Sequence, residues 1–196
     1  MIKKEIQEQR IRGYFIEATK ELLKGEGLKS VSVRNIADRA GYSYATLYNH
    51  FNDAKDLIFV CVKDFQKECA EFVRNETAGS PRGIEKIKAI VNAYLKYFVQ
   101  YPGIFELFFI EKVTDIANMQ STIETIYYLV DNMCSEEWTF CIAENIISAE
   151  EAEILKAEIR NNVAGALLFY INRRYPENYQ DFLRLIQTQM NHILNR

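Results

Sequence analysis

The sequence predicts an all-α fold, in which a small amino-terminal unit of three helices precedes a larger helical body. Three observations support this prediction. Apolar residues recur at steps of three and four along most of the chain, as they do on one face of a helix. Only 8 Gly and 3 Pro occur among the 196 residues, and most of them fall between the periodic segments. The hydrophobic content of 48% is sufficient for a substantial buried core.

The composition also excludes several classes of protein. The uncharged stretches are far shorter than the roughly 20 apolar residues that a membrane span requires. The first residues alternate charged and apolar side chains instead of forming the apolar core of a secretory signal, so we expect a cytoplasmic protein. Cys61, Cys69, Cys134 and Cys141 form no C-x-x-C pair and lie far from both histidines, so we expect no metal and no other cofactor. We interpret the cysteines as small buried hydrophobes, with a redox or metal sensor as the alternative.

The first helical segment, between Ile6 and Leu23, is amphipathic and is followed by glycines. Gly27 suits the left-handed conformation that closes a last helical turn. The apolar stripe of this segment consists of Ile11, Tyr14, Phe15, Ala18, Leu22 and Leu23.

Two short helices follow, and each begins at a serine. Ser32 is a good N-cap for a helix of about two turns that ends at Gly41, and Ser43 is a good N-cap for the next helix. Two capped helices separated by a tight glycine turn are typical of a helix-turn-helix, whose second helix enters the major groove of DNA. The apolar face of the first helix is formed by Val33, Ile36, Ala37 and Ala40.

The second helix carries polar groups at positions suited to DNA. We expect Tyr44, Thr46 and Asn49 on its exposed face, where hydroxyl and amide groups can meet base edges or phosphates. Residues 1–56 hold ten Lys or Arg against eight Asp or Glu, although the whole chain has a net charge of −3. A mildly basic segment on an acidic body fits a short DNA-reading module. The alternative is that the aromatic residues here only pack the short helices.

A further cation, Lys55, stands at the start of the next helix. The amide groups of a helix amino terminus and an ammonium group both favour a nearby phosphate. Asp53 is expected to cap this helix, with Asp56 three residues later in an arrangement close to a capping box.

Residues 10–60 resemble the TetR family of bacterial transcriptional regulators. This resemblance implies phosphate or base contacts by Arg34, phosphate contacts by Ser32 and Ser43 in addition to capping, and contacts with the DNA backbone by Tyr48 and His50. It also implies that Leu47 and Phe51 support the recognition helix from the core. The matching positions are Ala18, Leu22, Gly27, Val33, Ile36, Ala37, Ala40, Gly41, Ser43, Leu47, Tyr48, His50, Phe51, Lys55 and Leu57.

The remainder of the chain predicts a larger helical body. We place the domain boundary between a DNA-binding domain, residues 1–53, and a ligand-binding and dimerisation domain, residues 54–196. A loop rich in small residues separates the first two helices of the body. The helices are expected over residues 54–73, 84–100, 121–142, 149–174 and 178–195, with a short apolar run at 104–110.

The last two helices each carry an apolar stripe that needs a covering surface. The family resemblance implies that they pair with their counterparts in a homodimer through a four-helix bundle, which predicts a palindromic operator. Packing within one chain is the alternative. The predicted interface residues are Val163, Ala166, Leu167, Tyr170, Phe182, Ile186, Met190 and Ile193.

The middle of the body is rich in aromatic residues. Ordinary core packing is one interpretation, but the resemblance implies a small-molecule site there, with Glu106, Glu111 and Asn132 as possible polar contacts. The predicted pocket residues are Tyr94, Phe98, Phe105, Glu106, Phe108, Phe109, Tyr127, Tyr128, Trp138 and Phe169.

These observations predict a homodimeric, ligand-responsive DNA-binding regulator, namely a repressor released from its operator by a small molecule of unknown identity. An enzyme is not expected, because the sequence contains no G-x-S-x-G, H-E-x-x-H, P-loop or G-x-G-x-x-G motif. A helical adaptor that binds other proteins and an effector-activated regulator are the alternatives.

Overall fold

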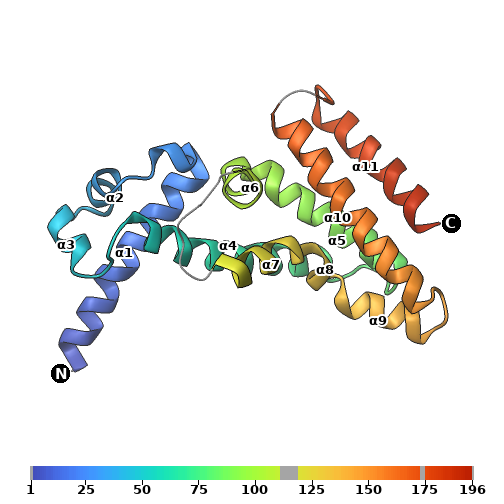
Figure 1. Ribbon diagram of the computed structural model, residues 1–196, viewed down its shortest axis with the longest axis horizontal. Helices are drawn as coiled ribbons and strands as arrows, with labels where there is room; N and C mark the ends of the chain where they lie inside the picture. The colour runs from blue at the N-terminus through green and yellow to red at the C-terminus, as the bar shows by residue number, and fades with distance from the viewer. Residues whose placement is uncertain (1, 111–118, 173–174, 196) are drawn as a thin grey trace. The chain divides into compact units, whose positions relative to one another are not determined.

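The computed structural model describes residues 2–110, 119–172 and 175–195, and within these ranges the regular structure is entirely helical (Figure 1). The all-α prediction is therefore confirmed. None of the helices in these ranges is both long and apolar enough to span a membrane. The chain forms two compact units. Unit 1 consists of Met1–Lys67 and Tyr101–Met119, and unit 2 consists of Glu68–Gln100 and Gln120–Arg196.

Unit 1 contains the predicted amino-terminal helices and one element from later in the sequence. Its elements are α1 (Ile2–Glu26), the 3-10 helix η1 (Leu28–Ser30), α2 (Val33–Ala40), α3 (Tyr44–Tyr48), the first part of α4 (Ala54–Glu76) and α6 (Pro102–Phe109). Helix α1 extends beyond the predicted segment at both ends and packs against α2 and α6. The core of the helix-turn-helix consists of Phe15, Ala18, Leu22, Ile36, Ala37, Leu47, Phe51 and Leu57.

One residue of the predicted stripe on α1 does not face this core. Tyr14 is exposed, and its ring stacks on Tyr42 with the ring centroids 6.0 Å apart. The next residue, Phe15, is fully buried and takes the core position. Tyrosine fits both environments because its ring is apolar and its hydroxyl is polar.

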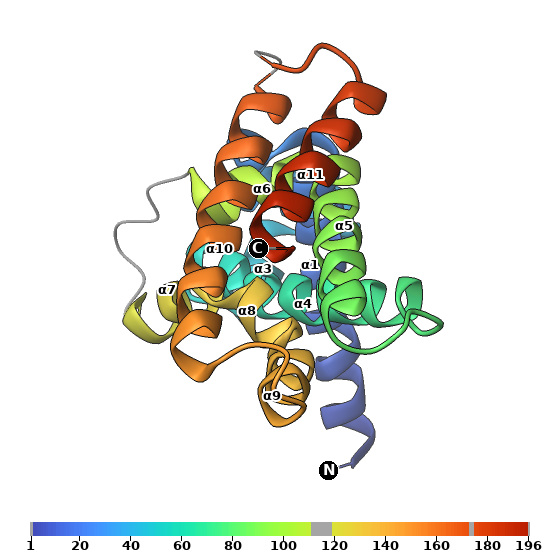
Figure 2. The same cartoon turned by 90° about the vertical axis from the view of Figure 1, so that its right-hand side faces the viewer.

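Unit 2 is built around long helices. Figures 1 and 2 show α10 and α11 side by side, with α5 packed against both. The elements are the rest of α4, α5 (Ile84–Gln100), α7 (Met119–Tyr127), α8 (Leu129–Met133), α9 (Ser135–Ala143), α10 (Ala149–Ile171) and α11 (Tyr179–Leu194). Side-chain N-caps start the last two: the amide of Glu151 donates to Ser148 Oγ at 3.1 Å, and that of Asp181 donates to Asn178 Oδ1 at 2.9 Å.

The single helix predicted over residues 121–142 is wrong, because the chain forms α7, α8 and α9 with breaks at Tyr128 and Cys134. Adjacent residues of an unbroken helix point in directions about 100° apart. The break allows Tyr127 and Tyr128 to flank one guanidinium, that of Arg160, at 4.2 and 5.0 Å from the ring centroids. Arg160 also forms an ion pair with Asp131 of α8. The predicted end of the 149–174 helix lies outside the described residues.

The two units do not divide the chain at the predicted boundary. They separate within α4, between Lys67 and Glu68, and residues 101–119 are grouped with unit 1. Helix α6 accounts for part of this difference, because it packs against α1 although the two are far apart in sequence. Helical periodicity predicts where helices occur, but it does not predict which helices pack together.

The expectation that the four cysteines are buried is confirmed, and all four are free thiols. Burial raises the pKa of the Cys69 and Cys134 thiols well above their ordinary value, and burial also raises that of Cys141. Thiols that are protonated and buried react slowly with oxidants and alkylating agents.

The contact between α6 and α1 depends on Gly103. A Cβ at this position would lie 2.3 Å from the carbonyl oxygen of Leu23, which belongs to the α1 backbone and cannot rotate away. We therefore expect Gly103→Ala to lower the free energy of unfolding by about 1–3 kcal/mol. Gly13 lies within α1 with open space around it, so Gly13→Ala should leave stability unchanged or raise it by about 0.5–1 kcal/mol. Urea denaturation of both variants measures the change in stability. The role assigned to Gly103 is contradicted if the two variants unfold with the same midpoint urea concentration.

Candidate nucleic-acid interface

Helix α2 is fixed at both ends by the predicted residues. The amide of Asn35 donates to Ser32 Oγ at 3.1 Å, which caps the amino terminus. Gly41 adopts the left-handed conformation, with φ 73°, at the carboxyl terminus, and the next amide, that of Tyr42, donates to the carbonyl of Ala37 at 3.0 Å. This turn requires a glycine because other residues rarely adopt a positive φ.

Helix α3 has only five residues and depends on its cap and on one buried side chain. The amide of Thr46 donates to Ser43 Oγ at 3.1 Å, and the two hydroxyl groups of Ser43 and Thr46 lie 2.9 Å apart. Leu47 is fully buried in the core. Burial of Leu47 therefore determines which face of α3 points outward.

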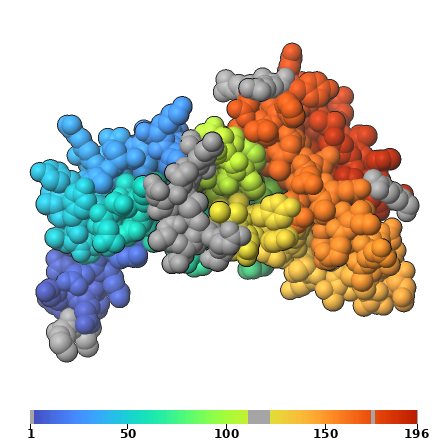
Figure 3. Space-filling view, in the orientation of Figure 1, coloured from blue at the N-terminus to red at the C-terminus, as the bar shows by residue number. Residues whose placement is uncertain are grey.

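The outward face of α3 presents two tyrosines. Tyr44 and Tyr48 have 65% and 54% of their surfaces exposed, although large aromatic side chains usually bury most of their area. Asn49 is also exposed beside them, whereas Thr46 is half-buried against Ser43. The surface of this segment is visible in Figure 3, where residues 44–50 are cyan. Hydroxyl and amide groups on a protruding helix are suited to phosphates and base edges.

His50 has a different environment from the tyrosines. It is half-buried, and its ring lies 6.2 Å from the ring of Phe15 in the core. One face of His50 therefore packs the helix-turn-helix from within. The interpretation of the aromatic residues as packing groups fits His50 better than it fits Tyr44 or Tyr48, which remain exposed.

Three cationic residues of α2 and α4 have two kinds of environment. Arg34 and Lys55 are exposed near the starts of α2 and α4, and Arg34 has no ion-pair partner within the described ranges. Arg39 instead binds Glu26 of α1 at 2.7 Å and Glu21 at 3.6 Å, so it holds α2 against α1. The start of α4 has the expected caps, because the Asp56 amide donates to Asp53 Oδ1 at 3.0 Å.

Tyr14 is a surface residue that the sequence analysis assigned to the core. It is exposed and stacked on Tyr42, which directly follows the Gly41 turn, so it lies beside the helix-turn-helix. The apolar spacing in α1 predicted burial for both Tyr14 and Phe15. Consecutive residues on a helix point about 100° apart, so both can fall within one apolar stripe of that width, and the pattern does not show which of them is buried.

The ten predicted pocket residues are divided between the two units. Phe105, Glu106, Phe108 and Phe109 lie on α6 in unit 1, and the others lie in unit 2. Within unit 2, Tyr94, Phe98 and Trp138 are buried, whereas Tyr127, Tyr128 and Phe169 are exposed. Asn132 lines a groove in unit 2, but none of the ten predicted residues does so. Glu111 lies outside the described residues. No group of three or more metal-ligating side chains occurs within the described ranges.

The predicted dimer residues lie mainly on the inner face of their helices. Ala166 and Tyr170 are half-buried, and Tyr170 stacks on Phe182 with the ring centroids 4.3 Å apart. The remaining residues are buried within the single chain: Val163, Leu167, Phe182, Ile186, Met190 and Ile193.

Comparison with known proteins gives a family for the amino-terminal segment. Residues 15–60 match the model of bacterial regulatory proteins of the tetR family. This range contains α2, α3 and the cap of α4. None of the curated proteins compared with this chain matches it.

Solved structures share the fold over nearly the whole chain. The transcriptional regulator FadR from Bacillus subtilis, in complex with stearoyl-CoA, is 15% identical with a TM-score of 0.72, covering 92% of this chain and 96% of the other. The fatty acid degradation regulator FadR from Bacillus halodurans is 16% identical with a TM-score of 0.72, covering 93% and 94%. A TetR family transcription regulator from Marinobacter aquaeolei is 14% identical with a TM-score of 0.65, covering 97% of each chain.

The fold of these regulators, the match over residues 15–60 and the capped geometry of α2 and α3 agree with one another. Residues 15–60 therefore match the helix-turn-helix segment of the tetR family, and the chain as a whole has the fold of the solved regulators.

Proposed function

We propose that this chain is a TetR-family transcriptional regulator, namely a repressor that binds a palindromic operator as a homodimer and is released by a small molecule bound in unit 2. The observation that carries the DNA-binding part is the outward face of α3, where Tyr44 and Tyr48 are exposed on a short helix held by Leu47. A single helix of five residues reads few base pairs. Two such helices related by twofold symmetry would read two half-sites of one operator.

The exposed face of α10 supports a dimer through residues other than those predicted. Ile154, Asn161 and Leu168 follow one another at intervals of seven residues, and all three are exposed. Seven residues correspond to about two helical turns, so they share one side of the helix. Gly165 lies on the same helix, and a Cβ there would have no atom within 4 Å. We therefore place the interface on this outer face, with Phe169 at its edge, whereas Val163 and Leu167 serve the core of each subunit.

Two of the structurally similar regulators support a choice of effector to test. The Bacillus subtilis regulator was solved in complex with stearoyl-CoA, and the Bacillus halodurans regulator controls fatty acid degradation. A long-chain acyl-CoA is accordingly the first effector to test. In this chain, the buried aromatic residues of α5 and α9, Tyr94, Phe98 and Trp138, supply apolar surroundings in unit 2.

The DNA-binding proposal is tested by selecting fragments of the source genome with the purified protein. We expect one palindrome to be enriched. Tyr44→Ala should weaken binding to it by about 5- to 150-fold, the range for loss of a good contact to a base edge. Tyr175→Ala is the matched control, because Tyr175 is 64% exposed but belongs to unit 2. Fluorescence anisotropy measures both affinities, and equal binding by the two variants would contradict the assignment of α3.

The dimer proposal is tested with Leu168→Glu. A carboxylate on the outer face of α10 would have to be buried at a twofold interface, so the dimer dissociation constant should rise by about thirtyfold or more. Ile146→Glu introduces the same charge at an exposed position between α9 and α10 and should not change the dimer. Sedimentation velocity over a range of concentrations distinguishes the variants. A Leu168→Glu protein that dimerises like the unaltered chain would exclude this face.

The effector proposal is tested with the selected operator. We expect stearoyl-CoA to weaken operator binding by about tenfold or more, within the usual range of coupling between two sites, while free CoA has no effect. Anisotropy titrations at a fixed concentration of protein measure the change. If stearoyl-CoA leaves operator binding unchanged, stearoyl-CoA is excluded as the effector, and the DNA-binding assignment is unaffected.

A further inference from the structure

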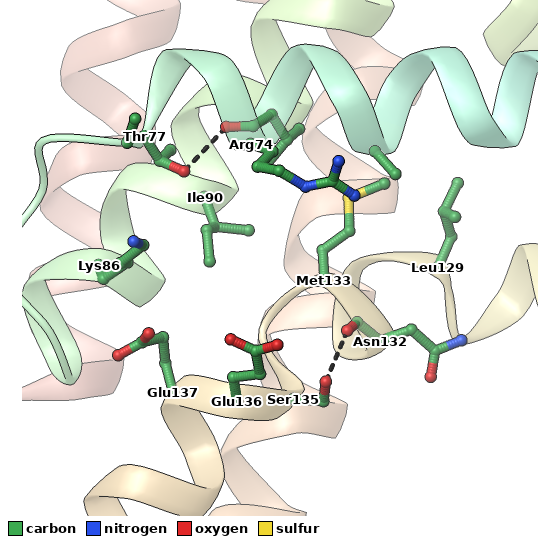
Figure 4. A pocket seen from close by; sticks show the side chains of 13 residues that line it. Arg74, Thr77, Lys86, Ile90, Leu129, Asn132, Met133, Ser135, Glu136 and Glu137 are labelled. Atoms are coloured by element: carbon green, nitrogen blue, oxygen red, sulfur yellow. Dashed lines mark hydrogen bonds between the residues drawn. The ribbon is translucent and has the colours of Figure 1, made fainter.

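Unit 2 contains a groove of about 500 Å³ that the sequence analysis did not predict (Figure 4). Three segments form it: the last turns of α4, the first turns of α5, and the α8–α9 region. None of its lining residues lies on α10 or α11, so the dimer face proposed above does not include it. Its apolar lining consists of Ala70, Val73, Ala78, Ile90, Leu129 and Met133.

Two cationic side chains at this groove are not neutralised. Arg74 of α4 and Lys86 of α5 have no ion-pair partner within the described part of the chain. In the view of Figure 4 they lie on either side of Ile90. By contrast, Lys96 and Lys88 in the same unit are paired with Glu76 at 2.6 Å and Glu85 at 2.9 Å.

The buried carboxylate at the groove already has hydrogen-bond and ion-pair partners. Glu137 is 4% exposed and accepts hydrogen bonds from the amide of Gly83 at 2.7 Å and from Arg82 Nε at 3.4 Å. The Arg82 guanidinium also lies 4.4 Å from the ring centroid of Phe140. Arg82 balances the charge of Glu137. Among the described residues that line the groove, the exposed carboxylate of Glu136 is then the one anionic group that remains near Arg74 and Lys86.

Among the neutral polar side chains that line the groove, two hydroxyl groups are hydrogen-bonded and one amide is not. The Ser135 hydroxyl donates to the carbonyl of Asn132 at 2.8 Å, and the Thr77 hydroxyl donates to that of Val73 at 2.8 Å. The side-chain amide of Asn132 has no hydrogen-bond partner within the described ranges and can donate to a ligand oxygen. The groove therefore offers two cations and an amide donor beside an apolar surface.

We propose that this groove binds a small organic anion with an apolar body. The carboxylate, phosphate or sulfonate oxygens are held by Arg74 and Lys86, and the apolar body covers Val73, Ile90 and Met133. Charge-assisted hydrogen bonds supply the preference for an anion, and burial of the apolar body supplies the remaining affinity. All residues that line the groove belong to unit 2, and the proposal does not depend on operator binding.

A matched pair of fluorescent probes tests this proposal on the full chain. The anion 1-anilinonaphthalene-8-sulfonate and the neutral N-phenyl-1-naphthylamine share an apolar body and differ by the sulfonate. We expect the anion to bind at least about tenfold more tightly, the effect of one charge-assisted contact. The only tryptophan in the chain, Trp138, directly follows Glu137 and gives a second signal through its emission.

Substitutions at the groove test whether the anionic probe binds there. Arg74→Gln and Lys86→Gln should each weaken binding of the anion by about tenfold and leave the neutral probe unchanged. Glu136→Gln should strengthen binding of the anion by about twofold, because it removes an exposed like charge. Arg184→Gln is the control, since it makes the same change in charge at an exposed residue of α11 that is paired with Asp181. Circular dichroism verifies that each variant is folded.

Competition identifies the anionic group. Displacement of the bound probe by 1-naphthoate, by 1-naphthyl phosphate or by both supports the proposal and shows which head group the cations prefer. The proposal is overturned if neither displaces the probe, if the cation 1-naphthylmethylamine displaces it equally well, or if the Arg74 and Lys86 variants bind the anion as tightly as the Arg184 control.

Discussion

The outward face of α3 depends on the burial of Leu47. An isolated helix of five residues is not stable in water, because nucleation costs more free energy than so few hydrogen bonds return. Helix α3 persists because Leu47 is inserted into the core formed by α1 and α2, while Ser43 caps its first turn. The same burial turns Tyr44 and Tyr48 outward. One short helix therefore combines a buried leucine that stabilises it with two tyrosines that stay exposed.

The parts of the fold that were predictable from the sequence are those governed by local chemistry. Ser32, Ser43, Asp53, Ser148 and Asn178 act as side-chain caps because hydroxyl, carboxylate and amide oxygens accept from the free amides of a first helical turn. Of these, Ser32, Ser43 and Asp53 were predicted from their positions before an apolar periodic segment. The exposure of Tyr44 was also predicted, because it directly follows the Ser43 cap at the start of a short helix.

Features that depend on distant contacts were not predictable. The breaks around α8 are associated with Arg160, which comes from α10 and brings Tyr127 and Tyr128 to one guanidinium. An apolar stripe likewise does not reveal whether it is covered by the same chain or by a partner. The predicted interface residues Val163 and Leu167 are covered within unit 2, and the exposed side of α10 became visible only once its neighbours were placed. The groove at Arg74 and Lys86 also depends on three segments that are separated in sequence.

The inclusion of α6 in unit 1 has a consequence for exchanging parts between regulators. A chimera that takes only the first 53 residues of this chain would leave behind Gly103 and the helix that packs on Leu23. The transplanted helix-turn-helix would then expose a strip of α1 that is covered in the intact chain, unless the recipient provides a helix with an equally small residue at the crossing. The unit that would have to be exchanged is thus discontinuous in sequence. Its compatibility with a new body depends on a backbone contact that lies outside the helix-turn-helix.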